Sequence, residues 1–498
     1  MTLDTSPQTA PPTTVRTSDP TRSSRAAGGG WFRAFWRWHF YASFLVIPVL
    51  LLLSVTGLIY LFRFQIEPLL NADVMKVDAP TGVVAQPYAS QQTAVERAYP
   101  DATLVSMTEP GAADRATVFS VTLADGAARD VYVNPYGAQV LGDINPDRTV
   151  SGIAVLLHGE LMAGLRGDLV IELGACWAIV MALTGYYLFF KGRRARARRR
   201  ASGVPGSALR SRHAMVGSVV GLGLLFLLAS GMPWTGVWGA KAQQLATAGG
   251  TSFWSTDPGG ISDPTSRLDE SLPHTHAAEV PWALGGSEVP QGSEQGSGQG
   301  SGQGGDAEGR SVANVDTAIE VADGAGLRHP MTVALPGGDG AEDRGVYSAI
   351  GYAFDDPTDE RTVHVDRFGG DVVSTYGYDD YPMLAKVVSQ GIGLHEGRSL
   401  GLVNFWASAL FCVAVMFMCV TGPLMWWRRR PARRAGAPSR SVAPRGKMPL
   451  RATPLLVVAL VALGVFLPLF GISLLVVLLL DQLVLRRVPR IAAWFNVA

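Results

Sequence analysis

Residues 40–62 read FYASFLVIPVLLLLSVTGLIYLF and contain no charged side chain. At about 1.5 Å per residue, a helix of this length crosses a hydrocarbon core of about 30 Å. Similar apolar blocks cover residues 169–190, 215–234, 402–427 and 454–485. The chain of 498 residues is 48% hydrophobic and only 17% charged, which excludes an ordinary soluble enzyme of this length. The sequence therefore predicts a polytopic α-helical membrane protein.

The charges between these blocks predict how the chain is oriented. Residues 191–213 and 428–451 each carry nine basic and no acidic residues. Residues 63–168 carry seven basic and 13 acidic residues, and residues 239–400 carry nine and 24. Lys and Arg next to a span stay on the cytoplasmic side, so we expect the basic loops and the N-terminus inside and the acidic segments outside. The net charge of +1 argues against a nucleic-acid partner.

The two ends of the chain differ in character. Residues 1–30 are rich in Thr, Ser, Pro, Ala and Gly and lack an apolar core, which is typical of a disordered cytoplasmic tail and not of a signal peptide. The last apolar block holds Pro468 and Gly471 near its middle and has basic residues at both ends. This favours a membrane hairpin over residues 454–486 followed by a cytoplasmic tail, 487–498, with one long tilted helix as the alternative.

Two sequence spacings each occur twice. In the first and third spans, a histidine precedes a Ser/Thr-Gly dipeptide by 17 residues. In the second and fourth spans, a Thr-Gly dipeptide follows the histidine of a Leu-His dipeptide by 26 residues, and that Leu-His dipeptide lies before the span. The matched positions are His39 with Thr56-Gly57, His213 with Ser230-Gly231, His158 with Thr184-Gly185, and His395 with Thr421-Gly422. Residues 131–140, VYVNPYGAQV, also resemble residues 363–372, VHVDRFGGDV. The sequence thus predicts an internal duplication.

Each unit consists of a span, an outer domain and a second span. The expected segments are a first span 31–64, an outer domain 65–150, an interfacial helix with the second span 151–190, a basic loop 191–212, a third span 213–238, a low-complexity linker 239–310, a second outer domain 311–383, an interfacial helix with the fourth span 384–427, and a basic loop 428–453. Residue patterns predict helices at 90–99 and 314–325 and strands at 117–123, 129–133, 346–353 and 361–366. Both outer domains are therefore expected to be small α+β domains.

Four of the eight histidines lie near the ends of the first four spans. The expected orientation places His39 and His213 near the cytoplasmic face and His158 and His395 near the outer face. A neutral imidazole is a good axial ligand for haem iron, so each pair could hold one haem between two helices. The alternative is that each histidine is only an interfacial polar residue. The repeated spacing favours ligation, because ligands to a shared cofactor cannot drift along a helix.

The outer pair raises a geometric problem. Twenty-six residues of straight helix would lift His158 well clear of the hydrocarbon if Gly185 lies in the inner half of its span. Gly164 and Gly167 follow His158, and Gly397 and Gly401 follow the matching His395. We expect these glycines to let a short interfacial helix fold back towards the bundle.

Other chemistry is sparse in the sequence. Glu172, near the outer end of the second span, is a candidate proton or cation site, with interfacial solvation as the alternative. His364 matches Tyr132 of the other unit, which suggests a position on a strand surface. The glycines of residues 291–305 belong to a flexible linker and not to a nucleotide-binding loop, because no strand precedes them and no helix follows.

Together these motifs and the closing TGPLMWWRRR at 421–430 resemble those of PepSY-associated transmembrane proteins, over about residues 31–485. The resemblance implies outward-facing PepSY domains in a bacterial cytoplasmic membrane. Members include iron-uptake-associated membrane proteins, and some are di-haem reductases of iron-loaded siderophores. In that branch the resemblance implies two b-type haems, held here by His39, His213, His158 and His395. The second unit departs from the pattern, since Asp-Arg-Phe at 366–368 replaces the Asn-Pro-Tyr turn.

Two functions of different classes follow. The first is a haem-dependent oxidoreductase that takes electrons from a quinol or a separate reductase, since no dinucleotide motif is present, and reduces a ferric chelate outside the membrane. The second is a membrane-anchored PepSY module that binds peptide or regulates a protease without a cofactor. A transporter for iron or its chelate is a third candidate, although the sequence lacks an ATP-binding loop. The presence of haem distinguishes the first function from the second.

Overall fold

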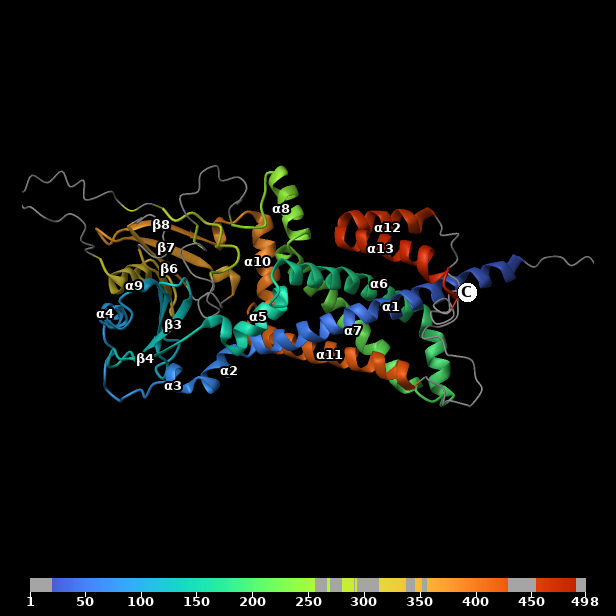
Figure 1. The fold of residues 1–498 in the computed structure, drawn as a ribbon, viewed down its shortest axis with the longest axis horizontal. Coiled ribbons are helices and arrows are strands. Elements are labelled where there is room, and N and C mark those ends of the chain that lie inside the picture. Colours follow the sequence, from blue (N-terminus) through green and yellow to red (C-terminus); the bar gives the residue numbers. More distant parts are fainter. Residues whose placement is uncertain are drawn as a thin grey trace, which may run out of the picture.

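The computed structural model describes residues 20–255, 267–268, 280–290, 292, 313–336, 345–351, 356–428 and 454–489. Two parts lie end to end along the long axis of the molecule, a β-sheet with its helices and a bundle of long helices (Figure 1). Most of the expected tail, residues 1–19, and most of the expected linker lie outside the described residues. Residues 20–30, expected to be disordered, form the start of the first helix.

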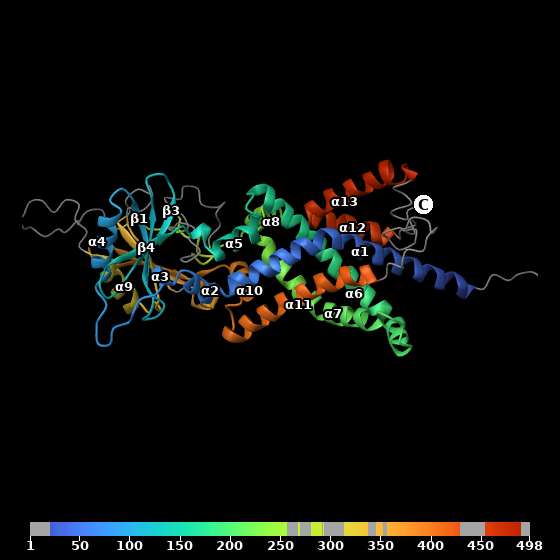
Figure 2. The same ribbon diagram turned by 60° about the horizontal axis from the view of Figure 1, so that its bottom comes forward.

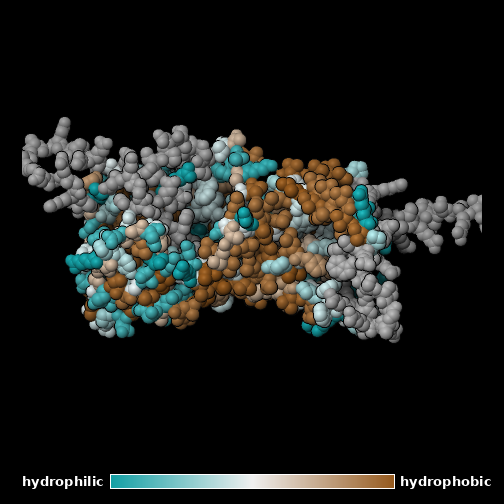
Figure 3. Space-filling model, viewed as in Figure 1, coloured by the Kyte–Doolittle hydropathy of each residue, from teal (hydrophilic) through white to brown (hydrophobic). Residues whose placement is uncertain are grey.

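Four long helices form the bundle: α1 (Pro20–Leu61), α6 (Leu165–Ala201), α7 (Ser207–Gly231) and α11 (Gly401–Arg428). With the C-terminal segment Pro468–Leu485, the described residues hold five helices that are long and apolar enough to cross a membrane. Apolar side chains cover the bundle, whereas the surface of the sheet part is mostly hydrophilic (Figure 3). Lipid requires such a surface, and the prediction of a polytopic helical membrane protein is confirmed.

The four long helices form a closed ring. Helix α1 packs on α6 and α11, and α7 packs on the same two helices, so α1 and α7 occupy opposite corners. Small residues allow the close approach of α1 and α6, because a Cβ atom on Gly174 would lie only 2.8 Å from Cγ1 of Val49. The buried centre of the bundle includes Val46, Cys176 and Ala178.

Two segments expected to be irregular are helical. Helix α6 continues to Ala201 and α7 begins at Ser207, so most of the basic loop expected at 191–212 belongs to these helices. Its Arg and Ala residues are strong helix formers, which explains the extension. Helix α8 (Trp238–Ala248) occupies the first part of the expected linker for the same reason, since its sequence is rich in Ala and Gln.

The C-terminal block folds back on itself. Helices α12 (Pro454–Phe466) and α13 (Pro468–Leu480) are separated only by Leu467, and a π-helical turn (Asp481–Leu485) follows. Pro468 has no amide hydrogen to continue the preceding helix. The two backbones touch where a Cβ on Gly464 would lie 3.1 Å from Cα of Gly471. The structure therefore has two helices here and not one long tilted helix.

The strands of both expected outer domains join in one antiparallel sheet, ordered β4-β3-β2-β1-β5-β6-β7-β8. The strands are β1 (Thr103–Thr108), β2 (Thr117–Thr122), β3 (Ala128–Val133), β4 (Val140–Ile144), β5 (Thr332–Ala334), β6 (Val346–Ile350), β7 (Arg361–Asp366) and β8 (Val372–Gly377). The halves meet where β1 pairs with β5, with Met107 opposite Val333. We name this junction the seam. The sequence predicted two domains but not that they share a sheet.

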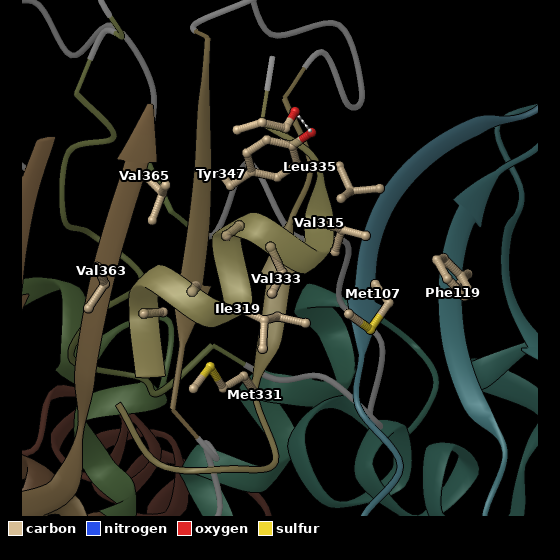
Figure 4. Close-up of a cluster of buried hydrophobic side chains, with 14 of the residues drawn as sticks. Met107, Phe119, Val315, Ile319, Met331, Val333, Leu335, Tyr347, Val363 and Val365 are labelled. Carbon is tan, nitrogen blue, oxygen red and sulfur yellow. Dashed lines mark hydrogen bonds between the residues drawn. The ribbon is translucent and has the colours of Figure 1, made fainter. Parts of the chain in front are cut away.

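Helices α4 (Tyr88–Ala98) and α9 (Val315–Gly324) pack on one face of this sheet through a common core. Alternate strand residues point towards them, as a strand's period of two requires. Ile319 of α9 lies between side chains of both halves, including Met107 and Phe119 of the first and Val333 of the second (Figure 4). Met107, Phe119 and Val333 have no exposed surface, so the two halves share one hydrophobic core.

Short helices connect the sheet to the bundle. Helix α5 (Val150–Glu160) follows β4, and α10 (Met383–Glu396) follows β8 and a 3₁₀ turn, Tyr378–Asp380. Both helices lie between the sheet and the long helices (Figure 1 and Figure 2). Helices α2 (Arg63–Leu70) and α3 (Ala72–Met75) connect α1 to the sheet.

Candidate functional site

Each of the four histidines expected as ligands meets the hydroxyl group of a Ser/Thr-Gly dipeptide on another helix. The hydrogen bonds from Nδ1 are His158 to Thr56 Oγ1 at 2.8 Å, His395 to Ser230 Oγ at 3.0 Å, His213 to Thr421 Oγ1 at 2.9 Å, and His39 to Thr184 Oγ1 at 3.4 Å. The exchange is reciprocal in the first half, where α1 supplies Thr56 to His158 on α5 and α6 supplies Thr184 to His39 on α1. The second half repeats it, with Ser230 of α7 bonded to His395 on α10 and Thr421 of α11 bonded to His213 on α7. The repeated dipeptides and histidines of the sequence are therefore contact partners.

The hydrogen bonds of these hydroxyl groups fix the imidazole tautomer. His39 Nδ1 lies 2.9 Å from the Met181 carbonyl oxygen, which can only accept, so this nitrogen carries the hydrogen. The hydroxyls of Thr56 and Thr184 donate to helix carbonyls at 2.9 and 2.8 Å, which leaves their oxygens as acceptors for Nδ1–H. The hydroxyl of Ser230 donates to its own helix in the same way. In His39, His158 and His395, Nε2 then keeps its lone pair, as metal coordination requires.

The glycine of each dipeptide leaves space for the imidazole ring. A Cβ on Gly185 would lie 3.1 Å from Cε1 of His39, and one on Gly231 would lie 3.3 Å from Cε1 of His395. The corresponding distance at Gly57 is 3.7 Å. A larger residue would press on the ring at the first two positions. The dipeptide thus combines an orienting hydroxyl with the space that the ring needs.

His158 and His395 form the sheet-side pair, at the end of the bundle next to the sheet. Their ring centroids are 6.4 Å apart, and the ring planes are inclined by 74°. Two imidazole nitrogens that bind one metal ion at about 2 Å each are about 4 Å apart, which places the ring centroids about 6 Å apart. The observed separation fits two axial ligands on one iron.

His39 and His213 form the loop-side pair, towards the helix ends that carry the basic residues. They belong to α1 and α7, which occupy opposite corners of the bundle. Gly422 of α11 lies between the corners, since a Cβ there would lie 3.7 Å from Cδ1 of Ile47 on α1 and 4.0 Å from Cε1 of His213. A group bound between the two histidines would lie inside the ring of helices.

Two elbows bring the sheet-side pair back to the bundle. Helix α5 ends at Leu161 and Met162, whose φ angles are 52° and 54°, and Gly164 has φ 56° before α6 begins. Gly167 packs directly on the carbonyl group of Glu160, where a Cβ atom has no room. In the other half Gly397 and Gly401 also have positive φ. His158 therefore lies on a separate helix that folds back, which resolves the distance problem posed by a straight span.

Buried acids anchor the first turn of α5 and the elbow between α10 and α11, and sequence reasoning missed them. Glu67 of α2 accepts hydrogen bonds from the backbone N–H and the hydroxyl of Ser151 at 2.7 and 2.6 Å. Glu360 pairs with Arg398 at 2.9 Å and accepts hydrogen bonds from Tyr381 and Ser389. Burial raises the pKa of the Glu360 carboxyl above its usual value, although Arg398 acts in the opposite direction. Only the contacts reveal these anchors, because the residues are distant in sequence.

Replacing Glu360 with Gln should destabilise the protein by about 3 kcal/mol, because the buried guanidinium of Arg398 loses one of its carboxylate partners, the other being Glu396 at 2.7 Å. The side chains of this pair are only 8% and 2% exposed. The matched control is Asp359→Asn, which breaks the Arg328–Asp359 pair, 63% and 40% exposed, and should cost about 0–1 kcal/mol. Denaturant unfolding of the detergent-purified protein measures both. Equal losses in the two variants would contradict the assigned role of Glu360.

Two weaker sequence candidates have structural roles. Glu172 is fully buried and therefore not solvated at the interface, and it accepts the backbone N–H groups of Val237 and Trp238 at 3.0 and 3.1 Å, so it holds the first turn of α8. His364 is buried under the sheet and not on a strand surface, with Nδ1 2.8 Å from Ser348 Oγ. Burial lowers the pKa of His364 to about 4. Within the described ranges no cluster of three or more His, Cys, Asp or Glu residues could hold a metal ion.

A polar cavity of about 290 Å³ opens at the seam, lined by residues of both halves, among them Tyr88, Glu109 and His329. Glu109 accepts hydrogen bonds from His329 Nδ1 at 2.6 Å, from the Tyr88 hydroxyl at 3.1 Å and from the Met331 N–H at 2.8 Å. Burial alone would lower the pKa of His329. The carboxylates of Glu109 and Asp323 raise this pKa by more than burial lowers it, so the pKa lies above its ordinary value. This network joins the halves of the sheet.

The seam should be weaker at alkaline pH. Because the pKa of folded His329 is raised, its protonated form stabilises the fold below the ordinary value of about 6.5, and this contribution is lost as the pH rises through the raised value. His329→Gln should therefore lower Tm most near about pH 5.5 and little near about pH 9. Thermal unfolding followed by circular dichroism at both pH values tests this. A difference in Tm that does not change with pH would show that the ion pair contributes nothing.

The comparisons with known proteins agree with the membrane architecture. A family model described as PepSY-associated TM region matches residues 36–429. The match contains all four histidines of the two pairs, both elbows and the whole sheet. No curated protein matches the chain.

Proposed function

Because the chain belongs to the family of the PepSY-associated TM region, we propose that it is a di-haem electron-transfer protein that reduces a ferric chelate outside a bacterial cytoplasmic membrane. The sheet-side pair would hold one b-type haem and the loop-side pair the other. When bound, haem supplies an iron atom that accepts and releases a single electron. The histidines hold the iron, and the four hydroxyl groups orient the rings.

One observation carries this proposal. All four histidines bond through Nδ1 to the hydroxyl of a Ser/Thr-Gly dipeptide, and in His39, His158 and His395 this assigns the hydrogen to Nδ1 and the lone pair to Nε2. Four histidines that were only interfacial polar residues would have no reason to share the same kind of hydrogen-bond partner. Hydrogen bonds of this kind from the non-ligating nitrogen are typical of metal-bound imidazoles, since they fix the tautomer and the ring orientation.

The rest of the proposal concerns topology. The basic ends of α6 and α7 support a cytoplasmic position for the loop-side pair and the N-terminus, which puts the sheet outside. Both halves have the order helix, four strands, short helix, long helix, which supports a duplication with two PepSY-like domains fused at the seam. The electron donor would be a quinol or a separate reductase, and the acceptor a ferric chelate during iron uptake.

An absorption spectrum of the detergent-purified protein, expressed with haem available, tests the proposal. The reduced protein should show b-type bands after dithionite, with two haems per chain by pyridine haemochrome assay. A colourless protein would refute it.

If the purified protein is colourless, a second function gains support, namely that of a peptide-binding module. The edge strand β8 exposes Val372 and Val373, by 45% and 39%, next to its unpaired backbone edge. Extended peptides bind such edges by adding a strand. A colourless protein whose sheet binds extended peptides would favour this function over electron transfer.

A further inference from the structure

A second cavity lies between the bundle and the sheet, next to the sheet-side pair. Its volume is about 350 Å³, and it is bounded by α7, α10 and the 3₁₀ turn Tyr378–Asp380. The apolar wall comprises Phe226, Met383, Val387 and Leu394. Phe226 belongs to a span, and Met383 and Val387 are 76% and 62% exposed. The cavity therefore opens at the molecular surface, beside a helix that is long and apolar enough to cross a membrane.

Two polar side chains of α10, Lys386 and Gln390, line the cavity beside its apolar residues. Lys386 donates one hydrogen bond, to the Asp379 carbonyl at 2.8 Å, of the three that an ammonium group can make. The Gln390 amide nitrogen donates to Asp356 at 3.2 Å, and the Gln390 side chain also bonds to Tyr378, whose hydroxyl lies 3.4 Å from the Lys386 carbonyl. The remaining hydrogens of Lys386 can bind an oxygen of a small polar ring.

The cavity shares a wall with the sheet-side pair. Leu394 immediately precedes His395 on α10. A Cβ on Gly391, which also lines the cavity, would lie 3.6 Å from Cβ of Ser230, whose hydroxyl bonds to His395. A ligand in the cavity would thus be separated from His395 by one layer of side chains.

We propose that this cavity binds the ring of a lipid-soluble quinone or quinol, with its isoprenoid tail along Met383 and Val387. The ring needs an apolar groove with a hydrogen-bond donor, and the apolar lining and Lys386 supply both. A phospholipid fits less well, since its headgroup would have Lys386 as the one cation that lines the cavity. The proposal rests on the proposed function, which requires a donor, but it concerns binding alone.

The test uses the full chain in nanodiscs of neutral phospholipid with a photoreactive short-chain quinone. Labelling should map to α10 or α7 and should be displaced by unlabelled quinone. Val387→Trp, which fills the cavity, should weaken binding by at least about tenfold. The matched control is Val403→Trp, a lipid-facing change on α11 at a residue 77% exposed, which should leave binding unchanged.

Three outcomes would overturn the proposal: equal binding by both variants, labelling away from this cavity, or displacement by phospholipid but not by quinone. Binding is read without reference to haem. A colourless protein that still binds the probe here would refute the proposed function alone, whereas a haem protein that fails to bind it would refute only the quinone site.

Discussion

His158→Ala is expected to remove about half of the haem from the purified protein. His158 and His395 face each other at 6.4 Å, so the loss of either leaves one iron with a single imidazole. His395→Ala should have the same effect, and the double variant should lose no more than either single variant, because residues that act as one unit are not additive. Haem is counted by the pyridine haemochrome assay on protein of known concentration.

The loop-side pair supplies an internal comparison for this experiment. His39→Ala should remove the other half of the haem, and combining it with His158→Ala should remove nearly all of it. His329→Gln is the matched control, since this histidine lies at the seam and belongs to neither pair. Retention of full haem content by His158→Ala, His395→Ala and His39→Ala would show that these histidines are not the ligands.

The second large effect is expected at Gly167. A Cβ atom there would overlap the carbonyl group of Glu160, so Gly167→Ala should force the α5–α6 elbow open. We expect a loss of about 3 kcal/mol or more in unfolding free energy, because backbone and not a flexible side chain must move. The sheet-side haem should be lost with it, since α5 carries His158.

Gly159→Ala provides the control for the elbow. Gly159 lies on α5 itself, and a Cβ there meets no atom within 4 Å. Alanine is the better helix former, so this change should leave stability unchanged or slightly raised. Thermal unfolding and haem content are measured on both variants. If Gly167→Ala matched the control in both, the tight elbow would have no role in placing His158.

The membrane architecture could be predicted from sequence because hydrophobic blocks and flanking charges are local signals. The histidine spacings were also readable, since histidines, hydroxyls and glycines repeat in register. Their contacts were not readable. Only the fold shows that Thr56 bonds to His158 and Thr184 to His39. Proximity across 102 or 145 residues has no signature in a single sequence.

The sheet shows the same limit. All of β2, β6 and β7 and most of β3 were expected from the residue pattern, but β1, β4, β5 and β8 were not identified. Strand β5 has three residues, too few for any periodicity, and is a strand because β1 and β6 flank it. The seam is thus decided by tertiary packing, as are the buried positions of Glu172 and His364.

The pairing of β1 with β5 also affects the distance between His158 and His395 at the end of the helix bundle. Helix α5 follows one end of the sheet and α10 the other, so the distance between His158 and His395 depends on the register of eight strands. A slip of one residue at the seam would shift one half by about 3.3 Å, more than an iron–imidazole bond can stretch. The sheet therefore acts as a spacer, and a mutation far outside the bilayer can act on the distance between two side chains at its edge.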